Sequence, residues 1–293
     1  MTRRPSRDLL DPETFGPWAV VTGASSGIGK EFARQLAANG LHVVLVARRL
    51  PLLEDLGHQL ATTYGVQYRS VGVDLTEPAF LATLEAATQD LDIGLLISNA
   101  GAFLPGAFLQ LDRSRLRQMV QLNAIAHLDL TNHFGQRMVA RGRGGLLLVA
   151  STAGLQGIPF SAEYAAAKGF VLNLGEALHV ELQNAGVHVT TLLPGAVDTP
   201  MLTDFGFDLI NTPIKPMSPE RCVAEGLAAL KMNRATHIAG RMNRIMAALI
   251  PRRVATRTYG RMAANVLAKR SASAATAVDH GNQRPPRLRD RYG

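Results

Sequence analysis

The sequence predicts an α/β fold in which a doubly wound parallel sheet forms a single domain, followed by a basic helical extension. Three observations support this: short apolar runs alternate with helix-length segments, a glycine-rich turn follows the first run, and positive charge gathers toward the C-terminus. Residues 1–230 hold 17 Lys+Arg and 21 Asp+Glu, whereas residues 231–293 hold 14 and 2. The chain is therefore a mildly acidic body with a basic appendage, and its overall basicity does not indicate a nucleic-acid partner.

Six short apolar runs bounded by turn residues are the predicted strands: 18–21, 43–46, 67–73, 93–97, 146–150 and 187–193. The segments between them are long enough for helices: 28–39, 50–64, 77–89, 113–140 and 162–184. This alternation is typical of βαβ units, which build a parallel sheet covered on both faces. Residues 236–239 are expected to add a last strand. Such sheets bind ligands at the carboxyl ends of their strands, so functional residues are expected just after each run.

The first predicted strand and helix are joined by a glycine-rich turn, Thr-Gly-Ala-Ser-Ser-Gly-Ile-Gly over residues 22–29. Glycine permits a tight turn and close approach of a pyrophosphate, and the helix N-terminus supplies free N–H donors. We therefore expect a Rossmann-type dinucleotide site. The residues expected at the cofactor are Thr22, Gly23, Ser25, Ser26, Gly27, Ile28 and Gly29.

The second predicted strand ends in Arg48 and Arg49, where an NAD-binding unit usually carries an acidic residue for the ribose hydroxyls. A guanidinium at this position can pair with a 2′-phosphate. NADP(H) is therefore the expected cofactor, with Arg48 as its partner and Arg49 facing solvent.

Polar and small residues also follow the third and fourth strands. Asp74, just before Leu75, can accept a hydrogen bond from an adenine amine. Asn99, Ala100 and Gly101 follow the fourth strand, and Asn99 and Gly101 are expected to shape the backbone beside the cofactor.

Four side chains have the chemistry for proton transfer. Tyr164 and Lys168 lie four apart on a predicted helix and share one face, and a nearby ammonium lowers a phenol pKa toward neutral pH. Such a phenol suits a general acid acting on a carbonyl oxygen. Ser151 follows the fifth strand, where its hydroxyl can bond a substrate oxygen. Asn123 can hold a water that links Lys168 to solvent, although taken alone it would be interpreted as a polar residue satisfied among helices.

Together with Pro-Gly-Ala-Val-Asp-Thr at 194–199, these motifs resemble the short-chain dehydrogenase/reductase family over residues 18–239. The resemblance implies that Tyr164 transfers the proton, Lys168 binds the nicotinamide ribose, Ser151 steadies the carbonyl and Asn123 completes a proton relay. It also implies that the nicotinamide end is bound by residues after the sixth strand, namely Pro194, Gly195, Val197 and Thr199.

Two positions depart from the family's usual pattern. Ser98 stands where the family more often carries Asn, which puts one local hydrogen bond in doubt. Ala150 stands where Ser is frequent, but Ser151 keeps the catalytic spacing. The resemblance also implies a homo-oligomer, a dimer or tetramer, through helices 113–140 and 162–184.

The substrate is expected to be a small lipophilic ketone or secondary alcohol, because the loops around the nicotinamide are apolar. The residues concerned are Phe103, Leu104, Phe108, Leu155, Ile158, Pro159, Phe160, Met201, Leu202, Phe205 and Phe207. Two alternatives stay open: a reductase of 3-oxoacyl groups on an acidic carrier protein, and a scaffold that binds NADP(H) without turnover. The ending of the second strand and the basic extension are similar to the branch of NADP-dependent lipid, steroid and ketone reductases.

The organisation expected along the chain is a flexible N-terminus at 1–16, the catalytic domain at 17–240, a basic amphipathic helical extension at 241–270 and a disordered basic tail at 271–293. In the extension, apolar side chains recur at helical spacing: Met242, Ile245, Met246, Leu249 and Ile250. We favour packing of this apolar face on the body over peripheral contact with a membrane.

The composition excludes several classes. With 47% hydrophobic and 18% charged residues the chain can bury a sizeable core, so it is not disordered throughout. The single cysteine, Cys222, excludes a disulfide scaffold and favours a reducing compartment. The basic N-terminus lacks the apolar segment of a secretion signal, so a cytoplasmic protein is expected. No metal is expected, because no His, Cys or acidic cluster has ligand spacing.

Overall fold

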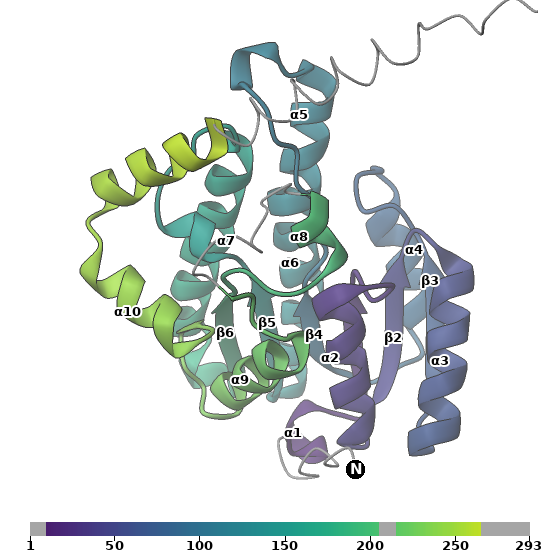
Figure 1. Ribbon diagram of the computed structural model, residues 1–293. Helices are drawn as coiled ribbons and strands as arrows, with labels where there is room; N and C mark the ends of the chain where they lie inside the picture. The colour runs from purple at the N-terminus through teal and green to yellow at the C-terminus, as the bar shows by residue number, and fades with distance from the viewer. Residues whose placement is uncertain (1–9, 205–214, 265–293) are drawn as a thin grey trace, which may run out of the picture.

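The computed structural model describes residues 10–204 and 215–264, which form a seven-stranded parallel sheet between two layers of helices (Figure 1). The strand order is β3-β2-β1-β4-β5-β6-β7, so the direction of winding reverses between β1 and β4. The strands are β1 (Trp18–Thr22), β2 (His42–Ala47), β3 (Tyr68–Gly72), β4 (Ile93–Ser98), β5 (Gly144–Val149), β6 (Val187–Leu193) and β7 (Thr236–Ile238). The predicted α/β fold class is confirmed.

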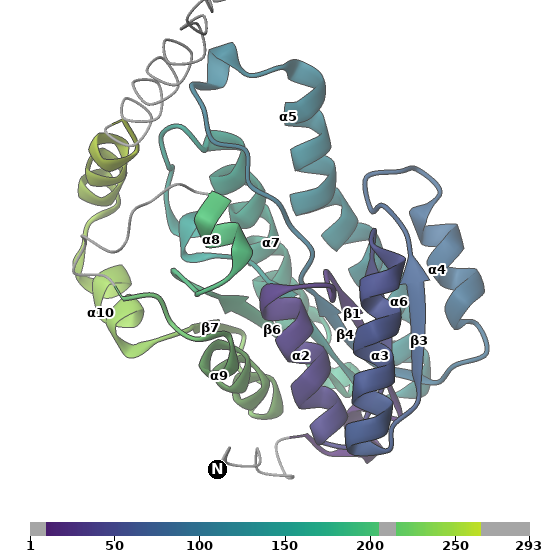
Figure 2. The same ribbon diagram turned by 45° about the vertical axis from the view of Figure 1, so that its right-hand side comes forward.

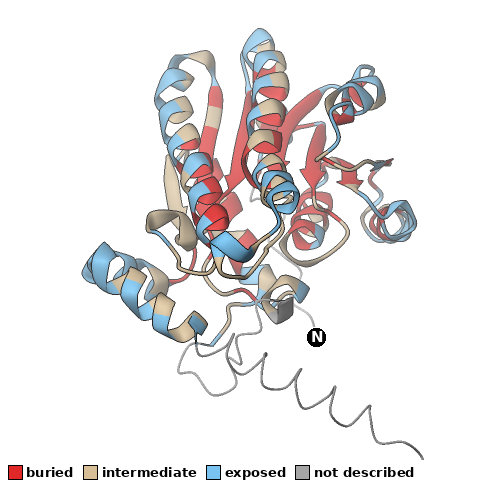
Figure 3. Ribbon diagram, turned by 90° about the horizontal axis from the view of Figure 1, so that it is seen from above, coloured by how far each residue is buried: buried red, intermediate tan, exposed pale blue. Residues whose placement is uncertain are grey.

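The central strands are buried on both faces because helices cover each side, as the red strands in Figure 3 show. One face packs against α2 (Gly27–Ala38), α3 (Leu50–Tyr64) and α9 (Pro219–Lys231). The other face packs against α4 (Phe80–Thr88), α6 (Ala126–Arg141) and α7 (Ala162–Glu181). Every residue of β1, β4 and β5 is buried. This explains why their sequences are continuous apolar runs and do not alternate between apolar and polar residues.

The long helix expected at 113–140 is interrupted. It begins as α5 (Arg113–Val120), passes through a π-helical turn at Gln121–Ile125 and continues as α6. Such turns insert one extra residue into the helix and are common at functional sites. Asn123 lies within this one and is fully buried.

The N-terminal segment is ordered over part of the range expected to be flexible. Asp11 accepts hydrogen bonds from the backbone N–H groups of Glu13 and Thr14 and caps a short helix, α1 (Pro12–Phe15). The Phe15 side chain is only 2% exposed and packs beside β5. An N-cap and one buried aromatic therefore fix residues 10–16, and residues 1–9 lie outside the described part of the chain.

The basic extension consists of α10 (Arg241–Leu249), beside the β7 edge of the sheet, and a second helix at 252–264, which lies farther from the sheet (Figure 2). Our interpretation that its apolar face packs on the body is wrong for four of the five residues named. Met242, Ile245, Leu249 and Ile250 are exposed, and only Met246 is partly covered. The expected disordered tail at 271–293 lies outside the described residues. No helix within residues 10–204 and 215–264 is long and apolar enough to cross a bilayer.

Candidate active site

A cradle for an anionic group lies between β1 and α2. Gly23 and Gly27 have φ of +70° and +54°, a left-handed backbone conformation that favours glycine. A Cβ at Gly29 would stand 2.2 Å from the Gly23 carbonyl oxygen, so only glycine fits where the helix crosses the loop. Ser26, the N-cap of α2, makes no side-chain capping bond. The first N–H groups of α2 thus face the cradle, as phosphate binding at a helix N-terminus requires.

Thr22 and Asn99 join the ends of β1 and β4 beneath this cradle. The Thr22 hydroxyl oxygen accepts the backbone N–H groups of Asn99 (2.9 Å) and Ala100 (3.0 Å). The Asn99 side-chain amide donates to the Thr22 carbonyl oxygen at 2.9 Å. Both side chains therefore hold backbone in place, which is the role expected of Asn99.

Charged groups lie where the adenosine end of a dinucleotide would sit. The Arg48 side chain is 75% exposed, and its guanidinium lies 4.0 Å from an Asp74 carboxylate oxygen. The other Asp74 oxygen accepts from the backbone N–H and hydroxyl of Thr76. Arg49 is exposed as expected, but it also donates to the Ser25 hydroxyl at 3.1 Å and so reaches the glycine-rich loop. Both arginines are available to an anion.

The proton-transfer residues surround Gly101. A Cβ built there would lie 2.9 Å from the Asn123 side-chain oxygen and 3.4 Å from Lys168 Nζ, so a larger residue would push them apart. Both polar atoms of the Asn123 side chain are bonded to the backbone of Ala102. Lys168 Nζ donates to the Val149 carbonyl oxygen at 2.9 Å and lies 5.9 Å from the centre of the Tyr164 ring. Asn123 thus shapes the loop after β4.

Burial controls the protonation of Tyr164 and Lys168. It raises the pKa of Tyr164 to about 12, and a hydrogen bond with the Ser151 hydroxyl opposes this rise only in part. Burial also lowers the pKa of Lys168 to about 7. The Tyr164 pKa is therefore not lowered as the sequence predicts, because desolvation of the phenol dominates. At neutral pH the phenol is protonated, which is the state of a proton donor.

Ser98 and His127 form a buried pair that sequence reasoning missed. The Ser98 hydroxyl lies 2.8 Å from His127 Nδ1, and His127 Nε2 lies 3.1 Å from the Ala100 carbonyl oxygen. Burial, together with the charge of Lys168, holds the pKa of His127 well below its usual value, so the ring is neutral. A neutral ring accepts from Ser98 and donates to Ala100. The available signal was the spacing of His127, four residues after Asn123 on one helix.

All these groups meet at one cleft of about 480 Å³. Every residue predicted to bind the cofactor or to take part in proton transfer lines it except Thr22 and Asn123, which act on the backbone behind it. The cleft is also lined by residues of the extension that the sequence did not indicate: Asn243, Met246, Tyr259, Met262 and Ala263.

The apolar residues expected at the substrate divide into three groups. Those that line the cleft are Phe103, Ile158, Phe160, Met201 and Leu202. Those that are not part of its lining are Leu104, Phe108, Leu155 and Pro159. Phe205 and Phe207 lie outside the described residues. The Phe103 ring meets the Tyr164 ring edge to face at 5.4 Å, which places an apolar wall beside the phenol.

The loop after β6 closes the cleft from the other side. Thr199 touches the position of a Cβ at Gly27, at 3.2 Å, so this loop reaches back to the phosphate cradle. At Gly195 a Cβ would lie 2.5 Å from the side-chain amide of Asn243 on α10. The nicotinamide end of the cleft is therefore in direct contact with the extension.

Known proteins resemble this chain in sequence and in fold. The family model described as short chain dehydrogenase matches residues 17–208. A 7beta-hydroxysteroid dehydrogenase of Collinsella aerofaciens is 31% identical over 241 residues, covering 79% of this chain and 89% of the relative. A solved structure of a short-chain dehydrogenase from Sphingobium yanoikuyae in complex with NADPH superposes with a TM-score of 0.72 at 29% identity, covering 95% of this chain and 100% of that one. A bulky-bulky ketone specific alcohol dehydrogenase from Comamonas testosteroni gives a TM-score of 0.69 at 27% identity, with 95% and 99% covered.

Proposed function

This chain belongs to the short-chain dehydrogenase/reductase family, and we propose that it is an NADP(H)-dependent oxidoreductase that interconverts a bulky lipophilic ketone and its secondary alcohol. One observation carries the proposal: a single cleft joins the glycine cradle and Arg48 to a protonated phenol at Tyr164. The relative that acts on hydroxysteroids and the similar structure that is specific for bulky ketones support the substrate class.

The residues present fit the cofactor. The loop turns so tightly that a Cβ at Gly29 would meet the Gly23 carbonyl oxygen, Ser26 leaves the first N–H groups of α2 without a side-chain cap, and Arg48 lies exposed on the same cleft. NADP(H) would supply or accept the hydride at the carbonyl carbon of the substrate. Lys168 and Thr199, which line the same cleft, would hold the nicotinamide ribose and carboxamide.

The chain's own residues supply the proton and orient the substrate. In the reductive direction Tyr164 donates its hydroxyl proton to the substrate oxygen as that oxygen gains negative charge. Ser151 bonds the same oxygen and the phenol, which fixes their separation. Asn123 keeps the loop of Ala102 in place, and the protonated form of Lys168 places positive charge near the phenol as the phenol loses its proton.

The apolar part of the cleft supports a lipophilic substrate. Side chains from three separate segments meet there: Phe103 after β4, Phe160 before α7, and Met246 on α10. A bulky apolar ketone would shield all three side chains from water, whereas a small polar ketone would leave them exposed to it. The scaffold alternative does not explain why an apolar wall stands beside a proton donor.

The test is a substrate panel followed by NADPH absorbance, with ketones graded in size and apolar surface. We expect kcat/KM to rise from small polar ketones to fused-ring and long-chain ketones at constant NADPH. Phe103→Ala should reduce that preference, and Phe108→Ala, an exposed phenylalanine outside the cleft lining, serves as the matched control. A panel in which small polar ketones react best would contradict the proposed substrate class.

We further propose that the protein is a cytoplasmic homo-oligomer able to contact membranes peripherally through residues 241–270. Exposed apolar side chains on the outer faces of α6 and α7 support an interface between copies: Leu128, Val139, Phe170 and Val180. Light scattering on a size-exclusion column measures the mass, and a monomer at micromolar concentration would contradict the oligomer.

A further inference from the structure

The extension carries an apolar stripe that faces outward. Met242, Ile245 and Leu249 recur at helical spacing on α10 and are 66%, 41% and 74% exposed. Ile250 and Val254 continue the exposed apolar surface into the next helix. Scattered exposed apolar residues are ordinary, but an apolar stripe along one face of a helix indicates a surface that binds another apolar surface.

The extension that carries this stripe is also strongly basic. Residues 241–264 contain six arginines and no acidic residue. On the helix at 252–264, Arg253, Arg257 and Arg261 are spaced four apart, so they share one face, and all three are exposed. An apolar stripe bordered by arginine is the pattern of a helix that lies in the interface of an anionic membrane.

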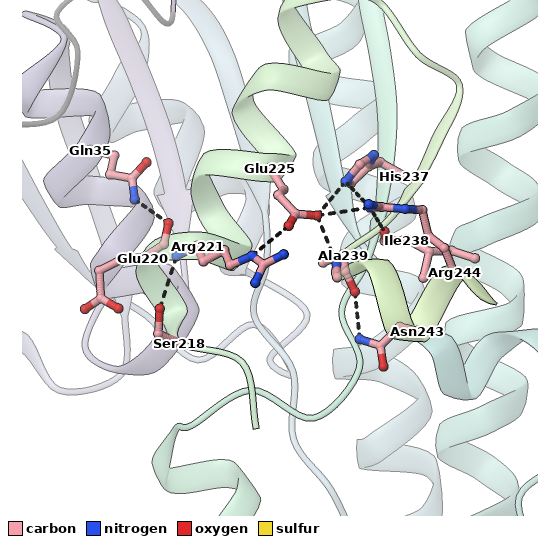
Figure 4. Close-up of polar contacts among 11 residues, drawn as sticks. Gln35, Ser218, Glu220, Arg221, Glu225, His237, Ile238, Ala239, Asn243 and Arg244 are labelled. Carbon is pink, nitrogen blue, oxygen red and sulfur yellow. Dashed lines mark hydrogen bonds and ion pairs between the residues drawn. The ribbon is translucent and has the colours of Figure 1, made fainter. Parts of the chain in front are cut away.

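A polar cluster on α9 and β7 fixes which face of α10 points outward (Figure 4). One carboxylate oxygen of Glu225 accepts the Gly240 N–H at 2.9 Å and lies 3.1 Å from both His237 Nε2 and Arg244 Nη1. The other oxygen accepts from Arg221 Nε at 3.1 Å. Arg244 also donates to the Ile238 carbonyl oxygen, so the first turn of α10 is attached to the body at several points.

The Glu225 cluster holds the first turn of α10, and the side of this helix that faces the body is packed. Asn243 donates to the Ala239 carbonyl oxygen at 2.7 Å and packs against Gly195, and Met246 lines the cleft. Met242 and Leu249 do not line the cleft and are left exposed to solvent. Their exposure therefore follows from how α10 is anchored and is not a consequence of a loosely placed helix.

We infer that the outer face of residues 241–264, formed by the Met242/Ile245/Leu249 stripe and the Arg253/Arg257/Arg261 row, is a docking surface for an anionic lipid bilayer. This goes beyond peripheral contact in general, because it assigns the face, its orientation and the charge of the lipid. A second copy of the chain fits less well, since a two-fold symmetric contact through this face would bring the Arg253/Arg257/Arg261 rows of two copies together, with no acidic residue in 241–264 to offset them. An acidic protein would neutralise the arginines but has no need of the apolar stripe.

The position of this surface also determines how a lipophilic substrate would reach the cleft, a point that rests on the proposed function. Met246, Tyr259 and Met262, on the inner side of the same two helices, line the cleft. A bilayer against the outer side would therefore lie one helix diameter, about 10 Å, from the cleft wall. A lipophilic ketone dissolved in the bilayer would reach the cleft with little transfer through water.

The test uses the full chain with vesicles of phosphatidylcholine alone or mixed with phosphatidylglycerol, followed by co-sedimentation. We expect binding to the mixed vesicles and little to the neutral ones, with binding weakening as salt increases. The double substitution Met242→Gln/Leu249→Gln should weaken the partition coefficient roughly tenfold or more. The double substitution Arg253→Glu/Arg257→Glu should weaken it about thirtyfold or more.

Matched controls distinguish vesicle binding through this face from binding caused by exposed apolar or charged side chains elsewhere. Met232→Gln replaces an apolar side chain at the end of α9 that is 55% exposed, and Arg113→Glu/Arg143→Glu reverses two exposed arginines outside the extension. Both should bind vesicles like the wild type. The Met242/Leu249 variant should keep its turnover of a water-soluble ketone, because neither residue lines the cleft. Lost vesicle binding with intact turnover thus tests docking independently of the proposed reaction.

Several outcomes would overturn the inference. One is equal binding of the Met242/Leu249 variant and the wild type. A second is equal binding to neutral and anionic vesicles. A third is absence of vesicle binding while the wild type binds an acidic carrier protein. A fourth is absence of vesicle binding with a fall in molecular mass for the variant, which would assign the stripe to contact between copies.

Discussion

Replacing Arg48 by Ala tests how the cofactor is chosen. The guanidinium of Arg48 is 75% exposed and its nearest carboxylate, on Asp74, is 4.0 Å away, so the substitution removes little from the folded protein. With NADPH bound, the same guanidinium would make charge-assisted hydrogen bonds to the 2′-phosphate, worth about 1.5–3 kcal/mol. At 1.4 kcal/mol per factor of ten, KM for NADPH should rise roughly 10- to 150-fold.

The assay is initial rates at varied NADPH and varied NADH, with one saturating ketone. Because the phosphate is remote from the reacting atoms, kcat with NADPH should change little, and KM for NADH should stay close to the wild-type value. Arg49→Ala is the matched control: it donates to Ser25 across the loop, so its loss should cost less than that of Arg48. An unchanged ratio of the two KM values in Arg48→Ala would refute this assignment of cofactor choice.

Three further predictions concern the cradle, the buried pair and the polar cluster. Gly29→Ala would place a Cβ 2.2 Å from the Gly23 carbonyl oxygen, so the loop must shift; NADPH affinity in a fluorescence titration should fall at least tenfold, and wild-type affinity would contradict the cradle. Ser98→Ala leaves the buried Nδ1 of His127 without its partner, so urea unfolding should show a loss of about 1–3 kcal/mol, whereas an unchanged midpoint would argue against the pair. Burial would raise the pKa of Glu225, but hydrogen bonds from Gly240 and its neighbours lower it to about 2. The carboxylate thus stabilises the fold above pH 4.5, and this contribution is lost as pH falls toward 2; in urea titrations the gap between wild type and Glu225→Gln should be widest at neutral pH and narrow below pH 4.5, and a gap independent of pH would refute it.

Much of the fold could be predicted because its central strands are buried on both faces. The run predicted at 18–21 is β1 (Trp18–Thr22), and the run at 93–97 is β4 (Ile93–Ser98). A strand covered by helices on each side must be apolar throughout, so its sequence is unambiguous. The glycine-rich loop was predictable for a related reason, since only glycine tolerates the backbone of Gly23 and Gly27.

Other features depend on contacts between distant segments, which periodicity does not reveal. The π-helical turn at Asn123 keeps the amphipathic pattern of an ordinary helix, and the side chain finds its partner in Ala102 on a loop 21 residues earlier. The role of His127 depends on Ser98 in the same way. The outward face of α10 depends on Glu225, whose carboxylate sets the rotation of the helix. An apolar stripe alone does not say whether a core or another surface covers it.

The measurement that tests the central claim most directly is NADPH oxidation with a bulky lipophilic ketone, compared between wild type and Tyr164→Phe, with NADPH binding measured on both. Tyr68→Phe, which removes a surface hydroxyl bonded to Glu54, is the control. The account predicts turnover by wild type and Tyr68→Phe, a loss of about 10²- to 10⁴-fold in kcat for Tyr164→Phe, and NADPH binding retained by all three. Turnover that survives in Tyr164→Phe, or tight NADPH binding by wild type with no turnover of any ketone, would contradict it.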